Sequence, residues 1–184
     1  DAVILAAPTG STPMMRTSGR DCLTAAATPD TRPPPPTGTA ITVTPGTCSS
    51  DLANFPVLVS ITNDPNLKTV ANGGHVQNAN GYDIIFRALD GKTQLDHEIE
   101  SYVGVNGTLV AWVRIPTLAY NADTTFFMYY GDAGTTSPTA NPTGVWDTVN
   151  GWRGVWHMNE ASSTARNDST SNANNLTQTG GVPL

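Results

Sequence analysis

The sequence predicts an all-β fold, an antiparallel β-sandwich of the jelly-roll or immunoglobulin-like kind with one short helix and an extended N-terminal arm. Short stretches from residue 39 onward either alternate apolar and polar residues or are apolar throughout. Gly, Asn, Asp and Pro recur at short intervals between these stretches, as turns require. Charged residues make up only 13% of the chain, against roughly 25% in an average soluble protein. Thr, Asn, Ser and Gly must therefore supply the polar surface.

The first two predicted strands differ in pattern. Residues 39–44 alternate polar and apolar side chains, which is typical of a strand with one face in the core. Residues 55–62 (FPVLVSIT) are almost continuously apolar, which suits a strand inside a sandwich.

The next strands include a predicted hairpin over residues 81–103. Asp90 and Gly91 provide the positive φ angles that a tight hairpin turn needs. Two further strands follow at residues 108–116 and 124–132, both rich in β-branched and aromatic side chains.

Residues 63–74 are the helix candidate. Asp64 can cap the helix, Pro65 would occupy its first position, and Gly73 can end it. Nearer the end of the sequence, residues 154–158 alternate aromatic and other side chains and predict one more strand.

The composition divides the chain into three parts. Residues 1–38 are a Thr/Pro-rich arm or linker, with an apolar run at 2–7 that predicts a short strand and four prolines that favour polyproline II. Residues 39–150 form the predicted sandwich, and 151–184 a further segment. The sequence does not start with Met and has no basic lead-in to its apolar run, so we expect a mature or cleaved product.

Two cysteines, Cys22 and Cys48, flank the proline run. A disulfide between them would stabilise the fold by about 3 kcal/mol in the chain-entropy model and would place the protein outside the cytoplasm. The alternative is a pair of buried thiols.

Charge excludes several partners. The net charge of −6 and the pI near 4.7 argue against nucleic acid and against anionic membrane surfaces. No stretch approaches the roughly 18 apolar residues of a membrane span.

The strongest candidate for chemistry is the acidic strand "LDHEIE". On a strand, Asp96, Glu98 and Glu100 share one face. Paired carboxylates serve glycoside hydrolysis, and the spacing is similar to the Glu-x-Asp-x-Glu strand of the laminarinase and lichenase family, although the order of Asp and Glu differs. The favoured alternative is a structural or cation-binding acidic strand, because three close carboxylates repel unless cations lie among them.

A second candidate is a cation site in "NDSTSNANN". Asp168, Asn172 and Asn174 offer oxygen ligands of the kind that calcium prefers. A loop whose Asn and Ser side chains satisfy its own backbone has the same sequence signature. The histidines His75, His97 and His157 are scattered, and the default for His157 is a packed or half-exposed side chain.

The strand aromatics allow two interpretations. They could form a sugar-stacking platform, but packing in the core is the commoner use. The residues concerned are Trp112, Phe126, Phe127, Tyr129 and Tyr130.

Ordered motifs carry a family resemblance. "FPVLVSI", "DIIFRALDGKTQLDHEIESY", "TLVAWVRIP", "FFMYYGD", "NPTGVWD" and "GVWHMNE" resemble, in this order, a domain of unknown function from large secreted and cell-surface proteins of bacteria and archaea. The resemblance covers residues 39–150. In that family a concanavalin-like (laminin-G-like) lectin domain often follows, and residues 151–184 are similar to the start of one.

The functional expectation combines these features. A partial lectin-like segment would leave unpaired strand edges, which recruit partners by strand addition. We therefore expect a non-enzymatic extracellular structural or adhesive protein, a homo-oligomer, polymer or subunit of a surface fibre. The alternatives are a carbohydrate-binding module of a larger adhesin, which would bind glycans, and a polysaccharide hydrolase that uses the acidic strand.

Overall fold

The structure, a computed structural model, describes residues 3–6, 38–46, 49–160 and 165–177. It confirms the all-β sandwich. Cys22, Cys48 and most of the predicted arm lie outside the described residues, so the predicted disulfide stays a prediction. The strands are β1 (Val3–Ala6), β2 (Gly38–Val43), β3 (Leu52–Ile61), β4 (Ile85–Arg87), β5 (His97–Val103), β6 (Thr108–Leu118), β7 (Thr124–Tyr129), β8 (Ala165–Arg166) and β9 (Leu176–Thr177).

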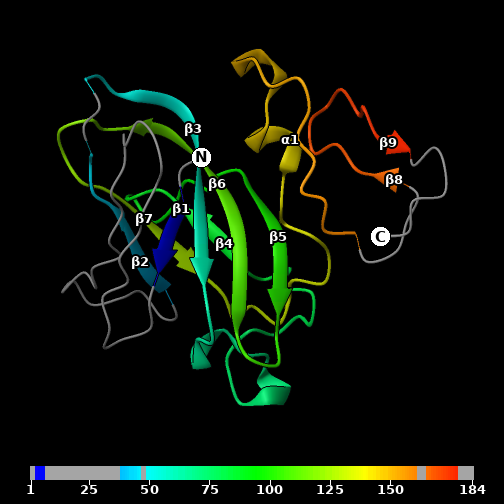
Figure 1. Ribbon diagram of the computed structural model, residues 1–184. Helices are drawn as coiled ribbons and strands as arrows, with labels where there is room; N and C mark the ends of the chain where they lie inside the picture. Colours follow the sequence, from blue (N-terminus) through cyan, green and yellow to red (C-terminus); the bar gives the residue numbers. More distant parts are fainter. Residues whose placement is uncertain (1–2, 7–37, 47–48, 161–164, 178–184) are drawn as a thin grey trace.

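Two sheets form the sandwich (Figure 1). One has the order β1-β3-β6-β5 and the other the order β2-β7-β4, while β8 and β9 pair as a separate short ribbon. Neighbouring strands run antiparallel except that β1 pairs parallel with β3 at the edge of the first sheet. The short strand expected at residues 2–7 is thus confirmed as an edge strand.

Period-two alternation decides which side chains enter the core. On β6, Leu109, Ala111, Val113 and Ile115 are buried, while the residues between them face outward and are half-exposed. The core lies between the two sheets and is completed from β2, β3, β4 and β7 by Ile41, Val43, Val57, Val59, Ile61, Phe86, Phe126 and Met128.

The predicted hairpin over residues 81–103 is wrong in its pairing, although its turn forms. Gly91 has φ +67°, and the Asp90 carboxylate accepts the N–H groups of Lys92 and Thr93. Only a short ladder follows the turn, because β4 then pairs with β7 and β5 pairs with β6. The chain therefore crosses from one sheet to the other at this turn.

A β-bulge interrupts β5. Its pairing with β6 shifts register between Ile99 and Ser101, so Glu100 is the extra residue. Ile99 and Tyr102 both pack against the core although they are three residues apart. The bulge thus leaves Glu98 and Glu100 together on the outer face, and this face carries the candidate site.

The predicted helix over residues 63–74 is also wrong. Two separate 3₁₀ turns form instead, η1 (Pro65–Leu67) and η2 (Val70–Asn72), because Lys68 and Thr69 are extended. The end signals were correct: the Asp64 carboxylate accepts the N–H of Asn66 at 2.8 Å, and Gly73 closes η2 at φ +84°.

The α-helix lies elsewhere, and the strand predicted at residues 154–158 is absent. Helix α1 (Pro142–Val145) and the 3₁₀ turn η3 (Thr148–Asn150) follow the last sandwich strand. Residues 152–160 have no ladder partner, since their side chains bind the outer face of β5 and β6 instead. None of the helices in the described part of the chain has the length and hydropathy that a membrane span needs.

Buried Asp83 fixes the loop that precedes β4. Its two carboxylate oxygens accept the N–H groups of Gln77, Asn78 and Gly131 at 2.8 to 2.9 Å. One side chain thereby ties the loop over residues 77–83 to the end of β7.

We expect Asp83→Ala to lower the free energy of unfolding by about 3 kcal/mol, because three buried N–H groups lose a charged acceptor. Urea unfolding monitored by tryptophan fluorescence measures this. The exposed Asp123, changed to Ala, is the matched control and should alter stability by less than about 0.5 kcal/mol. Equal effects of the two substitutions would contradict the assigned role.

Candidate functional site: a carboxylate and histidine clasp

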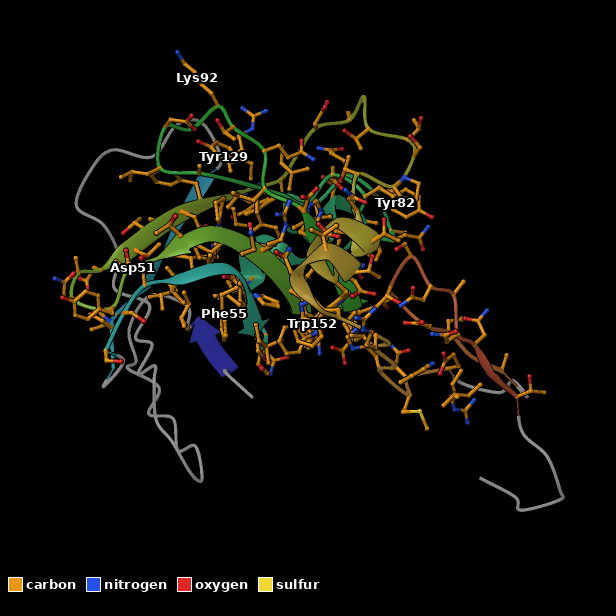
Figure 2. All side chains as sticks on the ribbon, turned by 90° about the horizontal axis from the view of Figure 1, so that it is seen from above. Asp51, Phe55, Tyr82, Lys92, Tyr129 and Trp152 are labelled. Carbon is orange, nitrogen blue, oxygen red and sulfur yellow. The ribbon has the colours of Figure 1, made fainter. Side chains whose placement is uncertain are left out.

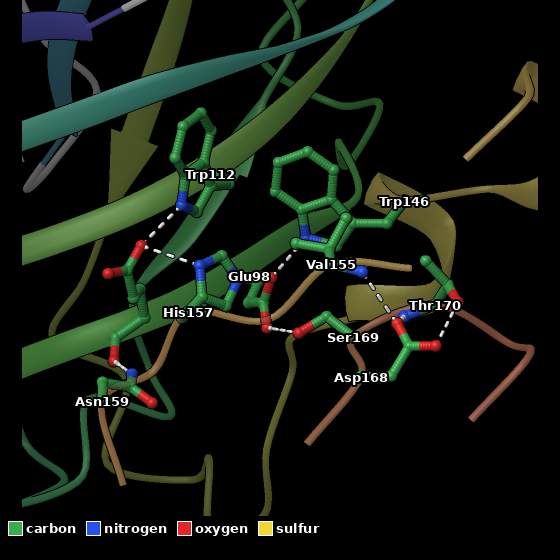
Figure 3. A network of polar contacts seen from close by, with 10 residues as sticks. Glu98, Trp112, Trp146, Val155, His157, Asn159, Asp168, Ser169 and Thr170 are labelled. Atoms are coloured by element: carbon green, nitrogen blue, oxygen red, sulfur yellow. Dashed lines mark hydrogen bonds and ion pairs between the residues drawn. The ribbon is translucent and has the colours of Figure 1, made fainter. Parts of the chain in front are cut away.

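The candidate site lies on the outer face of the first sheet, where the segment after α1 meets β5 and β6. Glu98 and Glu100 project from β5, and His157 approaches them from the unpaired segment over residues 152–160 (Figure 3). We call Glu98, Glu100 and His157 the clasp.

The Glu98 carboxylate is saturated with donors. Its Oε2 accepts the indole N–H of Trp146 at 2.5 Å and lies 3.0 Å from His157 Nε2. Its Oε1 accepts the hydroxyl of Ser169 at 2.6 Å. Three donors from a segment after β7 therefore meet on one side chain that is 11% exposed.

Glu100 holds the other side of the imidazole. Its Oε2 lies 3.2 Å from His157 Nδ1 and accepts the indole N–H of Trp112 at 2.7 Å. The main-chain oxygen of Glu100 also accepts the amide of Asn159 at 2.9 Å. Both ring nitrogens of His157 thus face carboxylates, which is the arrangement of a doubly protonated imidazolium.

Asp96 completes the acidic face with a separate partner. Its carboxylate forms an ion pair with Arg114 and accepts the amide of Asn141 at 2.8 Å. Gly144 lies so close that an added Cβ would stand 2.6 Å from the Asp96 carboxyl carbon. The residue before β5 therefore anchors the start of α1, as the clasp anchors the segment after it.

Aromatic rings pack around the clasp. Trp146 lies edge-on to Trp112 at 5.1 Å and to Trp152 at 4.8 Å between ring centroids. His157 stacks on Trp112 at 6.3 Å. Figure 3 shows the indole rings of Trp112 and Trp146 beside His157 and Glu98. This cluster is a second apolar layer outside the sandwich core.

The electrostatics favour the charged forms of both partners. Burial would raise the pKa of Glu98, but hydrogen bonds from His157, Ser169 and Trp146 outweigh it and lower the pKa below its usual value. The hydrogen bond to Glu98 raises the pKa of His157 against the effect of burial, with the nearby charges of Glu100 and Glu160 adding to the increase. The clasp is thus an ion pair in which one imidazolium lies between two carboxylates.

The predicted calcium residues form a loop that satisfies itself. Oδ1 of Asp168 accepts the N–H groups of Val155 and Thr170, and its Oδ2 accepts the hydroxyl of Thr170 and the N–H of Asn174. The side-chain amides of Asn172 and Asn174 both donate to the carbonyl of Arg153. The loop therefore satisfies its own backbone with Asp and Asn side chains, which is the alternative to a calcium site. Among the described residues no cluster of acidic or histidine side chains suited to a metal occurs.

The other predicted residues do not join the clasp. His97 is fully buried in the core, where its Nδ1 lies 3.3 Å from the Leu95 oxygen, and burial lowers its pKa. His75 is exposed on the loop after η2. Phe126 lies in the core, and Phe127 is 8% exposed. Trp112 belongs to the clasp surroundings, while Tyr129 and Tyr130 are half-buried.

Trp146 and Ser169, which bind Glu98, were not predicted from the sequence. One signal was present: three neighbouring carboxylates need cations, and a chain with nine Lys and Arg and three His offers few. Arg114 and His157 meet that need, one at each end of the acidic strand.

The comparisons with known proteins give a family and nothing closer. The family model of a domain of unknown function (DUF2341) matches residues 80–172. This range begins inside the predicted sandwich domain and continues past residue 150, through the segment that binds the clasp. No curated protein and no solved structure matches the chain.

The clasp should make stability depend on pH in a defined direction. Folding raises the pKa of His157 above its ordinary value of 6.5. Its contribution to the free energy of unfolding is therefore fully present below pH 6.5 and is lost as the pH rises through the raised pKa. The contribution of Glu98 is present above its ordinary value of 4.5 and lost as the pH falls through the lowered value. We expect His157→Gln to cost about 2 kcal/mol between these limits and less at alkaline pH.

Urea unfolding of both proteins across this pH range measures the difference. His75→Gln, which changes an exposed histidine, is the matched control and should leave the pH profile unchanged. A cost of His157→Gln that stays constant with pH would mean that the imidazole packs without carrying charge.

Proposed function

The chain belongs to the DUF2341 family, a domain of unknown function, and from that premise we propose that it is a non-enzymatic structural or adhesive module of an extracellular surface protein. One observation carries the proposal: every carboxylate of the acidic strand is occupied by partners from its own chain. The acidic strand therefore holds the fold together rather than presenting groups to a substrate.

The same contacts argue against the hydrolase alternative. A glycosidase needs one carboxyl group with a raised pKa, so that it can donate a proton to the leaving oxygen. The pKa of Glu98 is lowered instead, and Asp96, with Arg114 and Asn141 bound, also has a pKa below its usual value although burial opposes this.

The edge strand β1 supports assembly through arm exchange. It adds to β3 in parallel, and the next strand among the described residues begins at Gly38. A short edge strand at the end of a long connection can pair within its own chain or with β3 of another copy, which is the geometry of domain swapping. We propose that copies of the chain, or related subunits of a surface fibre, assemble in this way.

Secretion and a lectin-like neighbour complete the proposal. A surface of Thr, Asn, Ser and Gly with few charges, and a disulfide between Cys22 and Cys48, suit an extracellular setting. A concanavalin-like domain after this one would give the assembled protein its adhesive part.

Ile4→Pro tests arm exchange. Proline removes the N–H that a ladder needs, so we expect a concentration-dependent oligomer of the wild-type chain to become a monomer. Light scattering after size exclusion, with negative-stain imaging, measures this. Thr9→Pro, outside β1, is the matched control and should leave the oligomer intact. A wild-type chain that is monomeric at every concentration and forms no polymer would refute the assembly.

A hydrolysis assay tests the non-enzymatic role. We expect the wild-type protein to release no reducing ends from laminarin, lichenan or xylan above a protein-free blank. Glu98→Gln should instead lower the free energy of unfolding by about 2 kcal/mol, because it places an amide among three donors. Asp123→Asn is the control for stability. Hydrolysis by the wild type that Glu98→Gln abolishes would establish the enzyme instead.

A further inference from the structure

A small pocket lies between β5, the loop before β4 and the start of α1. It has a volume of about 210 Å³ and is lined by Asn80, Tyr82, Glu98, Ile99, Pro138 and Pro142, among others. Its walls come from the loop before β4 and from the chain that leads into α1, and Figure 2 shows Tyr82 beside that chain.

The walls are fixed before any ligand enters. The hydroxyl of Thr139 donates to the Tyr82 carbonyl at 2.7 Å and joins the two walls. Asp83, next to Tyr82, holds its loop through the N–H groups described above. A pocket whose walls are already ordered loses little entropy on binding.

The floor offers an unused donor and acceptor. The main-chain N–H of Arg114 donates to the Asp96 carbonyl at 2.9 Å, so the main-chain groups of Asp96 point toward β6. Main-chain groups alternate in direction along a strand, so those of Glu98 also point toward β6. His97 and Ile99 direct theirs outward. The His97 carbonyl accepts the N–H of Asn141, whereas the main-chain N–H and C=O of Ile99 have no partner among the described residues.

The neighbours of Ile99 prevent a strand from adding here. The His97 carbonyl is occupied on one side, and on the other the Glu100 carbonyl accepts the amide of Asn159. Neither carbonyl is therefore free to accept from an incoming strand on either side of Ile99. The pocket is also smaller than the roughly 300–1,000 Å³ of a site for a drug-sized ligand, so its occupant is small.

The charge and the surface of the pocket define that occupant. No cationic side chain lines it, so an anion is not favoured. The Glu98 carboxylate already binds Trp146, His157 and Ser169, so it is not free to hold a cation. Tyr82 and the prolines present apolar faces. The occupant must donate and accept hydrogen bonds with neighbouring groups, as hydroxyls do, and must also present C–H groups to a ring.

We propose that this pocket binds one neutral sugar ring, with two hydroxyls on the main-chain groups of Ile99 and a C–H face on Tyr82. The pocket uses none of the groups that β1 would exchange, so its ligand does not depend on the proposed assembly.

The test is a titration of the full chain with methyl β-D-glucopyranoside and with methyl β-D-galactopyranoside. Binding is monitored through the chemical shifts of the backbone amides. We expect at least one glycoside to shift the amide signals of Ile99 and Asn80, with an affinity near 1 mM. Tyr82→Ala should weaken binding by about tenfold, and Ala140→Trp, which fills the pocket, should abolish it. The exposed Tyr120, changed to Ala, is the control and should leave binding unchanged.

Three results would overturn the proposal. The first is that neither glycoside binds up to about 50 mM. The second is that Tyr82→Ala and Ala140→Trp both leave binding intact. The third is that N-acetylalanine N-methylamide binds more tightly than either glycoside, which would show a peptide site. Thermal unfolding of each variant confirms that it is folded, and two independent variants keep the test valid if one is not. A chain that assembles into a fibre but binds no sugar would refute this proposal and leave the proposed assembly standing. A monomer that binds sugar would do the reverse.

Discussion

The placement of one imidazole between two carboxylates organises the outer half of this molecule. Two glutamates on one strand face repel each other, and in a half-buried setting that repulsion is stronger than in water. His157 removes it by contacting both carboxylates. Once the imidazole is in place, Trp146 and Ser169 can complete the hydrogen bonds of Glu98 from either side. The segment after β7 is therefore held to the first sheet by charge and by aromatic packing, without pairing to a strand of that sheet.

The β-bulge in β5 is the backbone counterpart of this arrangement. Regular alternation would already place Glu98 and Glu100 on one face, but it would direct Ser101 toward the core and Tyr102 away from it. The extra residue restores Tyr102 to the core, where its hydroxyl donates to the Leu67 carbonyl at 2.7 Å. The bulge therefore leaves the two carboxylates on the outer face and returns Tyr102 to the inner face, where it binds the 3₁₀ turn η1.

The fold class and most strands could be predicted, because period-two alternation and turn residues are local signals. Which strands pair with each other could not be predicted from such local signals. Asp90 and Gly91 indicate a turn, yet nothing local says that β4 and β5 enter different sheets. The segment over residues 154–158 looks like a strand because alternating aromatic residues are the usual signature of one. Here His157 packs on Trp112 of β6, and the Trp156 indole N–H donates to the Asn174 carbonyl. The acidic face of Asp96, Glu98 and Glu100 was visible in the sequence, but its cations came from residues 18 and 59 positions away.

Occupied carboxylates and an unoccupied backbone edge point to different roles for one strand. On the outer face of β5 the charged side chains all bind partners in the same chain, so that face stabilises the fold. Along its edge, the contacts of Asn141 and Asn159 cover the positions on both sides of Ile99 and leave one donor and one acceptor open. A fully open edge would invite another strand and with it aggregation. Covered carbonyls on both sides of Ile99 hinder strand addition there, and the open groups between them suit the small ligand that we propose. Edge protection and ligand selection at β5 therefore have the same physical origin.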